Sequence, residues 1–188
     1  MRYKKYLPFL LIAGCFLLLK LSNIGIRLSD TNIYFYTGHM LLQGKLLYKD
    51  VFFTNFPLFP YISSLYVLVT GGQLPFYYLT APIEAVITSF LIYQIVLKQY
   101  KNSLLPAICS ALYLFSFILL ATTEHQTGVF LASLLAVTSY YFYLEKKNLL
   151  TGIFIACAFM TKAYFLPILL TYLVLFFWKE KSRGGPSA

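Results

Sequence analysis

The 188-residue chain has little charge, since only 11% of its residues are Asp, Glu, Lys or Arg, and Asp and Glu together number 6. Hydrophobic residues make up 60% of the chain, and the mean hydropathy is +0.73. A soluble domain of this size needs far more charge to cover its surface. The composition therefore excludes an ordinary soluble domain and predicts a polytopic membrane protein.

The chain also lacks the paired cysteines and histidine clusters of disulfide frameworks and metal sites. Its three cysteines, Cys15, Cys109 and Cys157, each lie alone in an apolar run. We interpret them as small buried hydrophobic residues and expect no metal and no cofactor. The net charge of +9 is not concentrated on one face, because the basic residues form short clusters between apolar runs. This pattern follows the positive-inside rule and argues against a nucleic-acid partner.

The apolar runs predict an all-α fold in the lipid bilayer, with about six transmembrane helices and two juxtamembrane helices on the outer face. The first run resembles a signal peptide, but no small-x-small cleavage site follows it, so we interpret it as a span with Lys20 reaching the interface. One membrane domain is expected over 1–181, followed by an unstructured tail over 182–188. The expected spans lie at about 6–26, 76–97, 103–121, 127–144, 149–161 and 163–178.

The lysine clusters predict the orientation of these spans. The segment 57–70 contains two prolines and is shorter than the ~20 residues that a span needs, so we expect it to remain on the outer face. The clusters at 98–101, 146–147 and 179–183 then share the cytoplasmic side with the basic N-terminus. Both termini are therefore predicted to be cytoplasmic, and residues 27–75 form an outer juxtamembrane loop.

Two short helices are expected within this loop, over 31–44 and 57–70. In the first, the apolar residues Ile33, Tyr36, Met40 and Leu41 recur with helical spacing and predict an amphipathic helix that lies in the membrane interface. The aromatic residues of the loop are expected in the headgroup region, where amphipathic rings settle. They are Tyr34, Phe35, Tyr36, Tyr48, Phe52, Phe53 and Phe56.

The few charged residues on the expected outer side are the candidates for chemistry. Asp30 precedes the first short helix and is either its N-cap or a general base, and Ser29 can cap equally well. Glu124 is either a solvated turn residue or a second acid of the same site, and Lys162 is either an interface anchor or a cation for a leaving phosphate. The other candidates have simpler interpretations. His39 is a polar-face residue, and His125 has no evident partner. Glu84, an acid within a span, is either a functional residue or, as we favour, a protonated acid bonded to a neighbouring helix.

The ordered motif Asp30, Tyr36, Leu41-Leu42, Gly44-Lys45, Tyr48, Asp50, Pro57-Leu58 and Tyr61, with Gly152, Ala156 and Thr161-Lys162 later, resembles the GT-C glycosyltransferases. These polytopic enzymes include protein O-mannosyltransferases and lipid A aminoarabinose transferases. The resemblance implies a partial GT-C fold that transfers a sugar, with inversion, from a polyprenyl-phosphate carrier to a hydroxyl acceptor on the outer face. It assigns Asp30 as catalytic base and Glu124, Lys162, Asp50 and Tyr48 to substrate binding.

The chain also departs from the pattern of that family. Thr31 follows Asp30 where many members have Glu, residues 55–58 read Asn-Phe-Pro-Leu in place of Lys-Pro-Pro-Leu, and no arginine occurs between Phe76 and Glu84. Family members are usually more than twice as long, so the chain would cover the N-terminal part of one, completed by further sequence or a partner chain. The alternative is a non-enzymatic multi-pass membrane protein, either a transporter fragment or an interaction subunit. A transporter would be expected to hold polar groups in broken helices near the midplane of the membrane.

Overall fold

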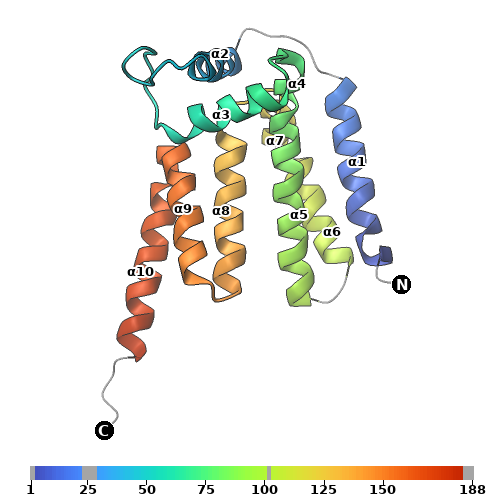
Figure 1. The fold of residues 1–188 in the computed structure, drawn as a ribbon. Coiled ribbons are helices and arrows are strands. Elements are labelled where there is room, and N and C mark those ends of the chain that lie inside the picture. The colour runs from blue at the N-terminus through green and yellow to red at the C-terminus, as the bar shows by residue number, and fades with distance from the viewer. Residues whose placement is uncertain (1–2, 23–28, 101–102, 184–188) are drawn as a thin grey trace.

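The computed structural model describes residues 3–22, 29–100 and 103–183, which fold almost entirely into helices (Figure 1). In order these are η1 (Tyr3–Tyr6), α1 (Leu7–Ser22), α2 (Asp30–Leu42), α3 (Leu58–Val69), α4 (Leu74–Tyr78), α5 (Thr80–Tyr100), α6 (Leu104–Leu114), α7 (Phe117–Thr122), α8 (Val129–Leu144), α9 (Asn148–Thr161), η2 (Ala163–Phe165) and α10 (Leu166–Arg183). Within these ranges, strand-like pairing is limited to an isolated bridge between Leu47 and Val51. The predicted all-α class is confirmed.

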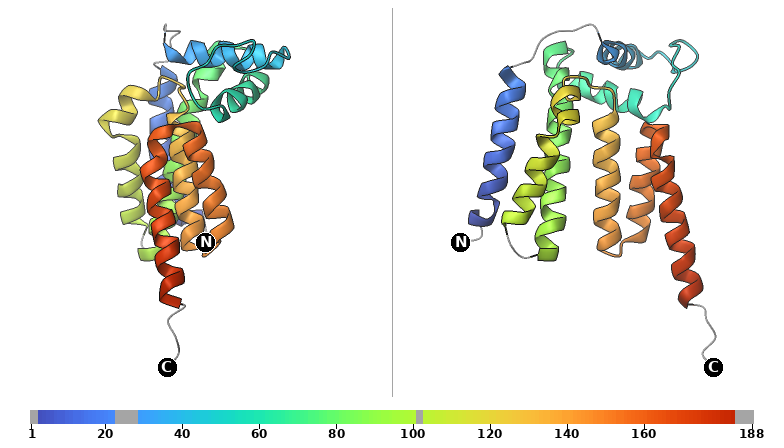
Figure 2. Two further views of the ribbon diagram at one scale, coloured as in Figure 1. Left: turned by 90° about the vertical axis from the view of Figure 1, so that its left-hand side faces the viewer. Right: turned by 180° about the vertical axis from the view of Figure 1, so that it is seen from behind.

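The helices form two groups with different directions. Helices α1, α5, α6, α8, α9 and α10 run roughly along one axis, and α2 and α3 lie across one end of them (Figures 1 and 2). We call residues 29–73 the cross layer and the other group the upright helices. The start of η1, the end of α5, the α8–α9 turn and the end of α10 all lie at the end away from the cross layer. The turn between α7 and α8 lies beside the cross layer.

Prolines help to define where these helices begin. Within the first turn of a helix the backbone N–H groups have no partner in that helix, so a proline there removes no hydrogen bond. Six prolines occupy such a position, near the starts of α1, α3, α4, α5, α6 and α10. They are Pro8, Pro60, Pro75, Pro82, Pro106 and Pro167.

Several boundaries differ from those expected. The segment expected as one span at 103–121 is broken at Phe115 and Ser116, where the Ser116 hydroxyl accepts a bond from the Leu119 amide and starts α7. Helix α10 continues to Arg183, so the unstructured tail expected over 182–188 is wrong for residues 182 and 183, and its remaining residues lie outside those described. The end of the first expected span, at 23–26, lies outside the described residues. Among those described, the stretch Leu74–Tyr100 is the one helix long and apolar enough to cross a membrane.

Helix α2 packs on α3 through a face that lies away from Ile33 and Tyr36 of its apolar stripe. Its buried residues are Thr31, Tyr34, Thr37 and Gly38, whereas Ile33 and Tyr36 are more than half exposed. The reason is close contact between the two helices. A Cβ atom on Gly38 would lie 2.9 Å from the backbone of Ser63 in α3, and the Ser63 hydroxyl donates a hydrogen bond to the Tyr34 carbonyl at 2.7 Å. The absence of a side chain at Gly38 permits this approach.

An aromatic cluster lies beneath α2. The ring of Tyr34 meets Phe53 and Phe59 edge to face, with centroid separations of 5.6 and 4.8 Å. All three rings are buried within the protein, so Tyr34 and Phe53 face other side chains of the cross layer. The cysteines also differ from expectation, because Cys15 is exposed and Cys109 and Cys157 are half-buried.

Candidate functional site

Asp30 is the first residue of α2, and Ser29 occupies the N-cap position before it. The backbone of Ser29 is extended, and its side chain makes no capping hydrogen bond. The interpretation of Asp30 as the N-cap therefore does not fit the structure. The Asp30 side chain is exposed and lines a pocket of about 540 Å³ between the start of α2 and the α7–α8 turn.

Lys162 lies between α9 and η2 and points under α2. Its ammonium donates a hydrogen bond of 2.9 Å to the Tyr34 hydroxyl, 128 residues away in sequence, and lies 5.2 Å from the centre of the same ring. Asn55 donates a second bond to this hydroxyl at 3.3 Å. Lys162 and Asn55 also line a second pocket, of about 380 Å³. Lys162 is thus half-buried and fixed, unlike a solvated interface anchor.

Asp30 and Lys162 share one electrostatic environment. Burial lowers the pKa of the Lys162 ammonium, and the Asp30 carboxylate opposes this change. Burial raises the pKa of the Tyr34 hydroxyl, and Asp30 raises it further. Both effects place the Asp30 charge within Coulombic range of the Lys162–Tyr34 pair. The Asp30 charge therefore acts on the Lys162–Tyr34 pair, although Asp30 and Lys162 line different pockets.

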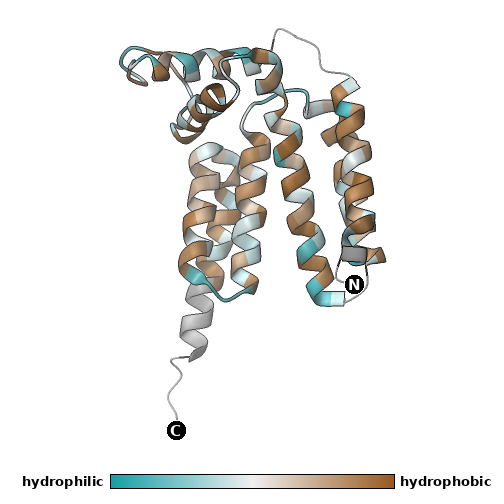
Figure 3. Cartoon of the chain, turned by 45° about the vertical axis from the view of Figure 1, so that its right-hand side comes forward, coloured by the Kyte–Doolittle hydropathy of each residue, from teal (hydrophilic) through white to brown (hydrophobic). Residues whose placement is uncertain are grey.

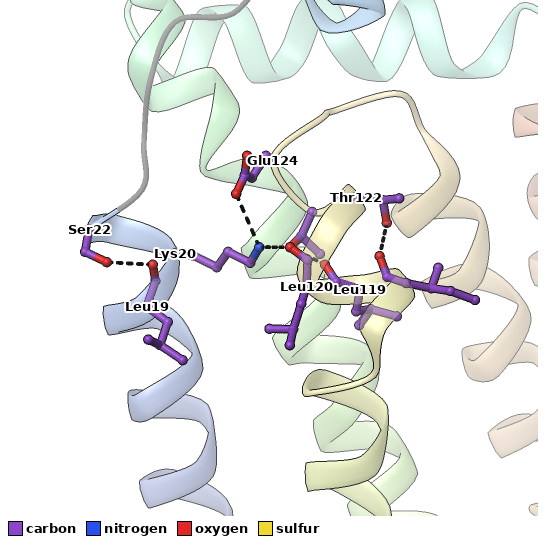
Figure 4. A network of polar contacts seen from close by, with 9 residues as sticks. Leu19, Lys20, Ser22, Leu119, Leu120, Thr122 and Glu124 are labelled. Atoms are coloured by element: carbon purple, nitrogen blue, oxygen red, sulfur yellow. Dashed lines mark hydrogen bonds and ion pairs between the residues drawn. The ribbon is translucent and has the colours of Figure 1, made fainter.

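Glu124 lies in the α7–α8 turn and pairs with Lys20 of α1 (Figure 4). The Lys20 Nζ to Glu124 Oε1 distance is 3.8 Å, and the same ammonium donates to the Leu120 carbonyl. Lys20 is only 6% exposed, so its ammonium is buried against the protein in the last turn of α1. Its charge is neutralised at the end of α1. Glu124 does not line the Asp30 pocket, although its neighbour His125 does.

We expect Glu124→Gln to lower the thermal midpoint of the purified chain. The substitution removes the negative partner of a buried ammonium, and breaking a buried ion pair costs about 3–5 kcal/mol. Because Glu124 is 24% exposed and the pair is 3.8 Å long, about 1–3 kcal/mol is the appropriate range here. Thermal unfolding in detergent measures the change. Glu145→Gln is the matched control, since that exposed acid pairs with exposed Lys98 at 2.5 Å and its loss should change stability little. Equal midpoints for wild type and Glu124→Gln would contradict the role of the pair.

Asp50 and Tyr48 stabilise the loop between α2 and α3. Asp50 accepts a hydrogen bond from the Leu46 amide at 2.9 Å, which closes the turn. Tyr48 has a positive φ of 67°, and its hydroxyl donates to the Asn55 carbonyl at 2.7 Å. Tyr48 thereby holds the residue that contacts the Tyr34 hydroxyl. Neither side chain lines the Asp30 pocket or the Lys162 pocket.

Glu84 is a buried acid at the junction of the two groups of helices. Its Oε1 accepts a 2.5 Å bond from the Tyr66 hydroxyl of α3, and its Oε2 accepts a 3.0 Å bond from the Gln126 amide. Gln126 also donates to the Thr80 hydroxyl at 2.8 Å. The interpretation of Glu84 as an acid bonded to a neighbouring element fits this geometry. The network joins the cross layer to α5 and to the α7–α8 turn.

The structure thus places Asp30 and Lys162 at two different pockets, Glu124 on the same turn as a pocket residue, and Asp50 and Tyr48 in the supporting loop. Sequence reasoning missed Tyr34 as a site residue. The small residues Thr31, Thr37 and Gly38 on its helical face were the available signal, because they indicate a face in close helix contact. In comparisons with protein-family models, curated proteins and solved structures, the chain finds no match.

Proposed function

We propose that the chain is a multi-pass membrane protein whose upright helices cross the bilayer, with the cross layer on the outer face and both termini in the cytoplasm. Exposed leucines support this placement. Leu10, Leu11 and Leu18 of α1 and Leu112 of α6 are each more than 60% exposed, which is costly in water but favourable in lipid. The upright helices are mainly apolar, and hydrophilic residues gather at their ends (Figure 3). Charged Lys98, Glu145, Lys146 and Lys147 lie at the end away from the cross layer.

Cysteine labelling tests this topology. In a background without Cys15, Cys109 and Cys157, single cysteines are placed at Gln73 and Lys146, which are both exposed. An impermeant maleimide should label Gln73→Cys in intact cells and Lys146→Cys only after permeabilisation, because the two positions lie at opposite ends of the upright helices. Labelling of Lys146→Cys in intact cells would overturn the six-span arrangement.

We further propose that the chain is the N-terminal module of a GT-C-type glycosyltransferase that uses a polyprenyl-phosphate sugar. The observation that supports this best is that the helix carrying Asp30 also carries Tyr34, whose hydroxyl accepts a hydrogen bond from Lys162. An outer-face carboxylate next to an open pocket provides a base. A fixed ammonium beside a second pocket provides a counter-charge for phosphate. A base for the acceptor proton and a cation for the phosphate are the two groups that this transfer requires.

The proposed reaction proceeds in one displacement. The acceptor hydroxyl gives its proton to the Asp30 carboxylate as its oxygen attacks the anomeric carbon. The bond between that carbon and the phosphate oxygen breaks, and its electron pair stays with the phosphate, whose charge Lys162 offsets. Attack opposite the leaving group inverts the anomeric centre. The proton and the negative charge that develop in this step each have a protein partner.

The alternative of a transporter has less support. Glu84 is the acid expected for such a path, yet each of its carboxylate oxygens already accepts a hydrogen bond from the protein. The direct test of the enzyme is sugar transfer in membranes, measured as polyprenyl phosphate released from a radiolabelled polyprenyl-phosphate sugar. The chain is assayed together with any partner that completes the fold. Release that depends on the chain supports the proposal, and its absence with every lipid-phosphate sugar tried would remove it.

A further inference from the structure

The Asp30 pocket has a polar wall with unused hydrogen-bonding capacity. Besides Asp30, the polar residues among those described that line it are Ser29, Thr122, His125 and Thr127. Among the described parts of the chain, neither Ser29 Oγ nor His125 Nδ1 has a hydrogen-bond partner, although both atoms are buried from solvent. A buried polar group without a partner costs about 1–3 kcal/mol. Two such atoms at one pocket, on elements far apart in sequence, indicate that a ligand supplies their missing hydrogen bonds.

The other wall of this pocket is apolar. Ile118, Val129 and Phe130 line it from α7 and α8. A ligand that satisfies both walls presents hydroxyl groups on one side and C–H groups on the other. A sugar ring has this shape, with polar edges and apolar faces. A hydroxyl can also donate or accept, so it suits either tautomer of His125.

The distribution of charge separates this pocket from its neighbour. Within the described residues, no lysine or arginine lines the Asp30 pocket, whereas Lys162 lines the second pocket, with Thr54 and Asn55. A phosphate beside Asp30 would be repelled by the carboxylate. The Asp30 carboxylate therefore disfavours an anionic ligand in its pocket, and the Lys162 ammonium favours an anion in the second pocket.

We propose that the Asp30 pocket binds a neutral polyhydroxylated ring, with Ser29 and His125 as its binding residues. This inference rests on the proposed function, in which the ring is the hydroxyl acceptor. The ring places one hydroxyl at the Asp30 carboxylate and exchanges hydrogen bonds with Ser29 Oγ and His125 Nδ1. Its C–H face packs on Phe130. The lipid phosphate then occupies the Lys162 pocket.

Histidine NMR tests the binding directly. The chain has two histidines, and His39 is exposed on α2, so His39→Gln leaves His125 as the single histidine. The ring-labelled full-length variant in nanodiscs is titrated with the methyl glycosides of glucose, galactose, mannose and arabinose. We expect at least one glycoside to shift the His125 ring signals in a saturable way. Farnesyl phosphate, the anionic probe, should leave these signals in place. It should bind more weakly to Lys162→Met.

Ser29→Ala distinguishes a binding role from a structural one. Removing an unpaired buried hydroxyl should leave the thermal midpoint equal or higher, because no hydrogen bond is lost. Glycoside binding should nevertheless weaken about three- to tenfold, the usual worth of one hydrogen bond. A lower midpoint with unchanged binding would contradict the proposal. So would the absence of a saturable shift with every glycoside, or a His125 shift caused by farnesyl phosphate.

The two proposals can fail independently. The titration contains no sugar donor, so glycoside binding without any transfer would retain the pocket assignment and remove the enzyme. Transfer whose acceptor KM is unchanged in Ser29→Ala and His125→Gln would retain the enzyme and remove the pocket assignment.

Discussion

Asp30→Asn should reduce sugar transfer by about 10²–10⁴-fold while leaving the fold intact. The amide has no lone pair basic enough to take the acceptor proton, whereas it matches the carboxylate in size. Stability should change little, because the side chain is exposed and Ser29, not Asp30, occupies the N-cap position of α2. Release of polyprenyl phosphate from a radiolabelled donor measures the rate, and thermal unfolding in detergent measures the fold.

Asp50→Asn is the matched control for this experiment. Asp50 is also an exposed carboxylate of the cross layer, but it accepts a hydrogen bond from the Leu46 amide and lines neither pocket. An Asn side chain can accept the same bond, so transfer should remain close to that of the wild type. If Asp30→Asn and Asp50→Asn transferred sugar equally well, the catalytic assignment of Asp30 would be lost. The resemblance to GT-C enzymes would then concern the fold alone.

The positions of the helices along the chain could be predicted from the sequence, because apolar runs and the helix-breaking residues between them determine where each helix begins and ends. Helices α3, α8 and α9 occupy Leu58–Val69, Val129–Leu144 and Asn148–Thr161, each within two residues of the expected range. Their membrane insertion stays a prediction, since the described part of the chain has one helix that is long and apolar enough by itself.

The faces and partners of these helices could not be predicted, because they depend on contacts between distant segments. Lys20 resembles an interface lysine in sequence, and only its pairing with Glu124, more than 100 residues later, explains its burial. The stripe of Ile33 and Tyr36 follows helical spacing, yet close approach at Gly38 selects the opposite face of α2. Asp30 could be predicted as a site residue, because it is an acid in the loop that follows the first helix. Tyr34 could not, because only its hydrogen bond with the distant Lys162 makes it part of the site.

Gly128 at the start of α8 links the cross layer to the upright helices. Its φ is +81°, its amide donates to Gln126 Oε1 at 3.1 Å, and a Cβ atom there would lie 2.6 Å from the ring of Phe59. The left-handed conformation costs a non-glycine residue about 1–2 kcal/mol. Overpacking against a buried ring adds about 1–3 kcal/mol. We therefore expect Gly128→Ala to destabilise the chain by roughly 2–5 kcal/mol, the largest loss of stability that we predict for a single substitution.

Gly44→Ala separates these two contributions. Gly44 has nearly the same φ, +82°, but a Cβ atom there would meet no other described residue within 4 Å beyond its chain neighbours, so only the conformational cost of about 1–2 kcal/mol should appear. The contact with Phe59 is tested by adding Phe59→Leu, which shortens the opposing side chain. The double variant Gly128→Ala with Phe59→Leu should be more stable than the sum of the two single effects, since each change relieves the other. Thermal unfolding of the wild type, the two single variants Gly128→Ala and Phe59→Leu, and the double variant in the same detergent measures this coupling. Strict additivity, or equal losses for Gly44→Ala and Gly128→Ala, would show that Phe59 does not rest against Gly128.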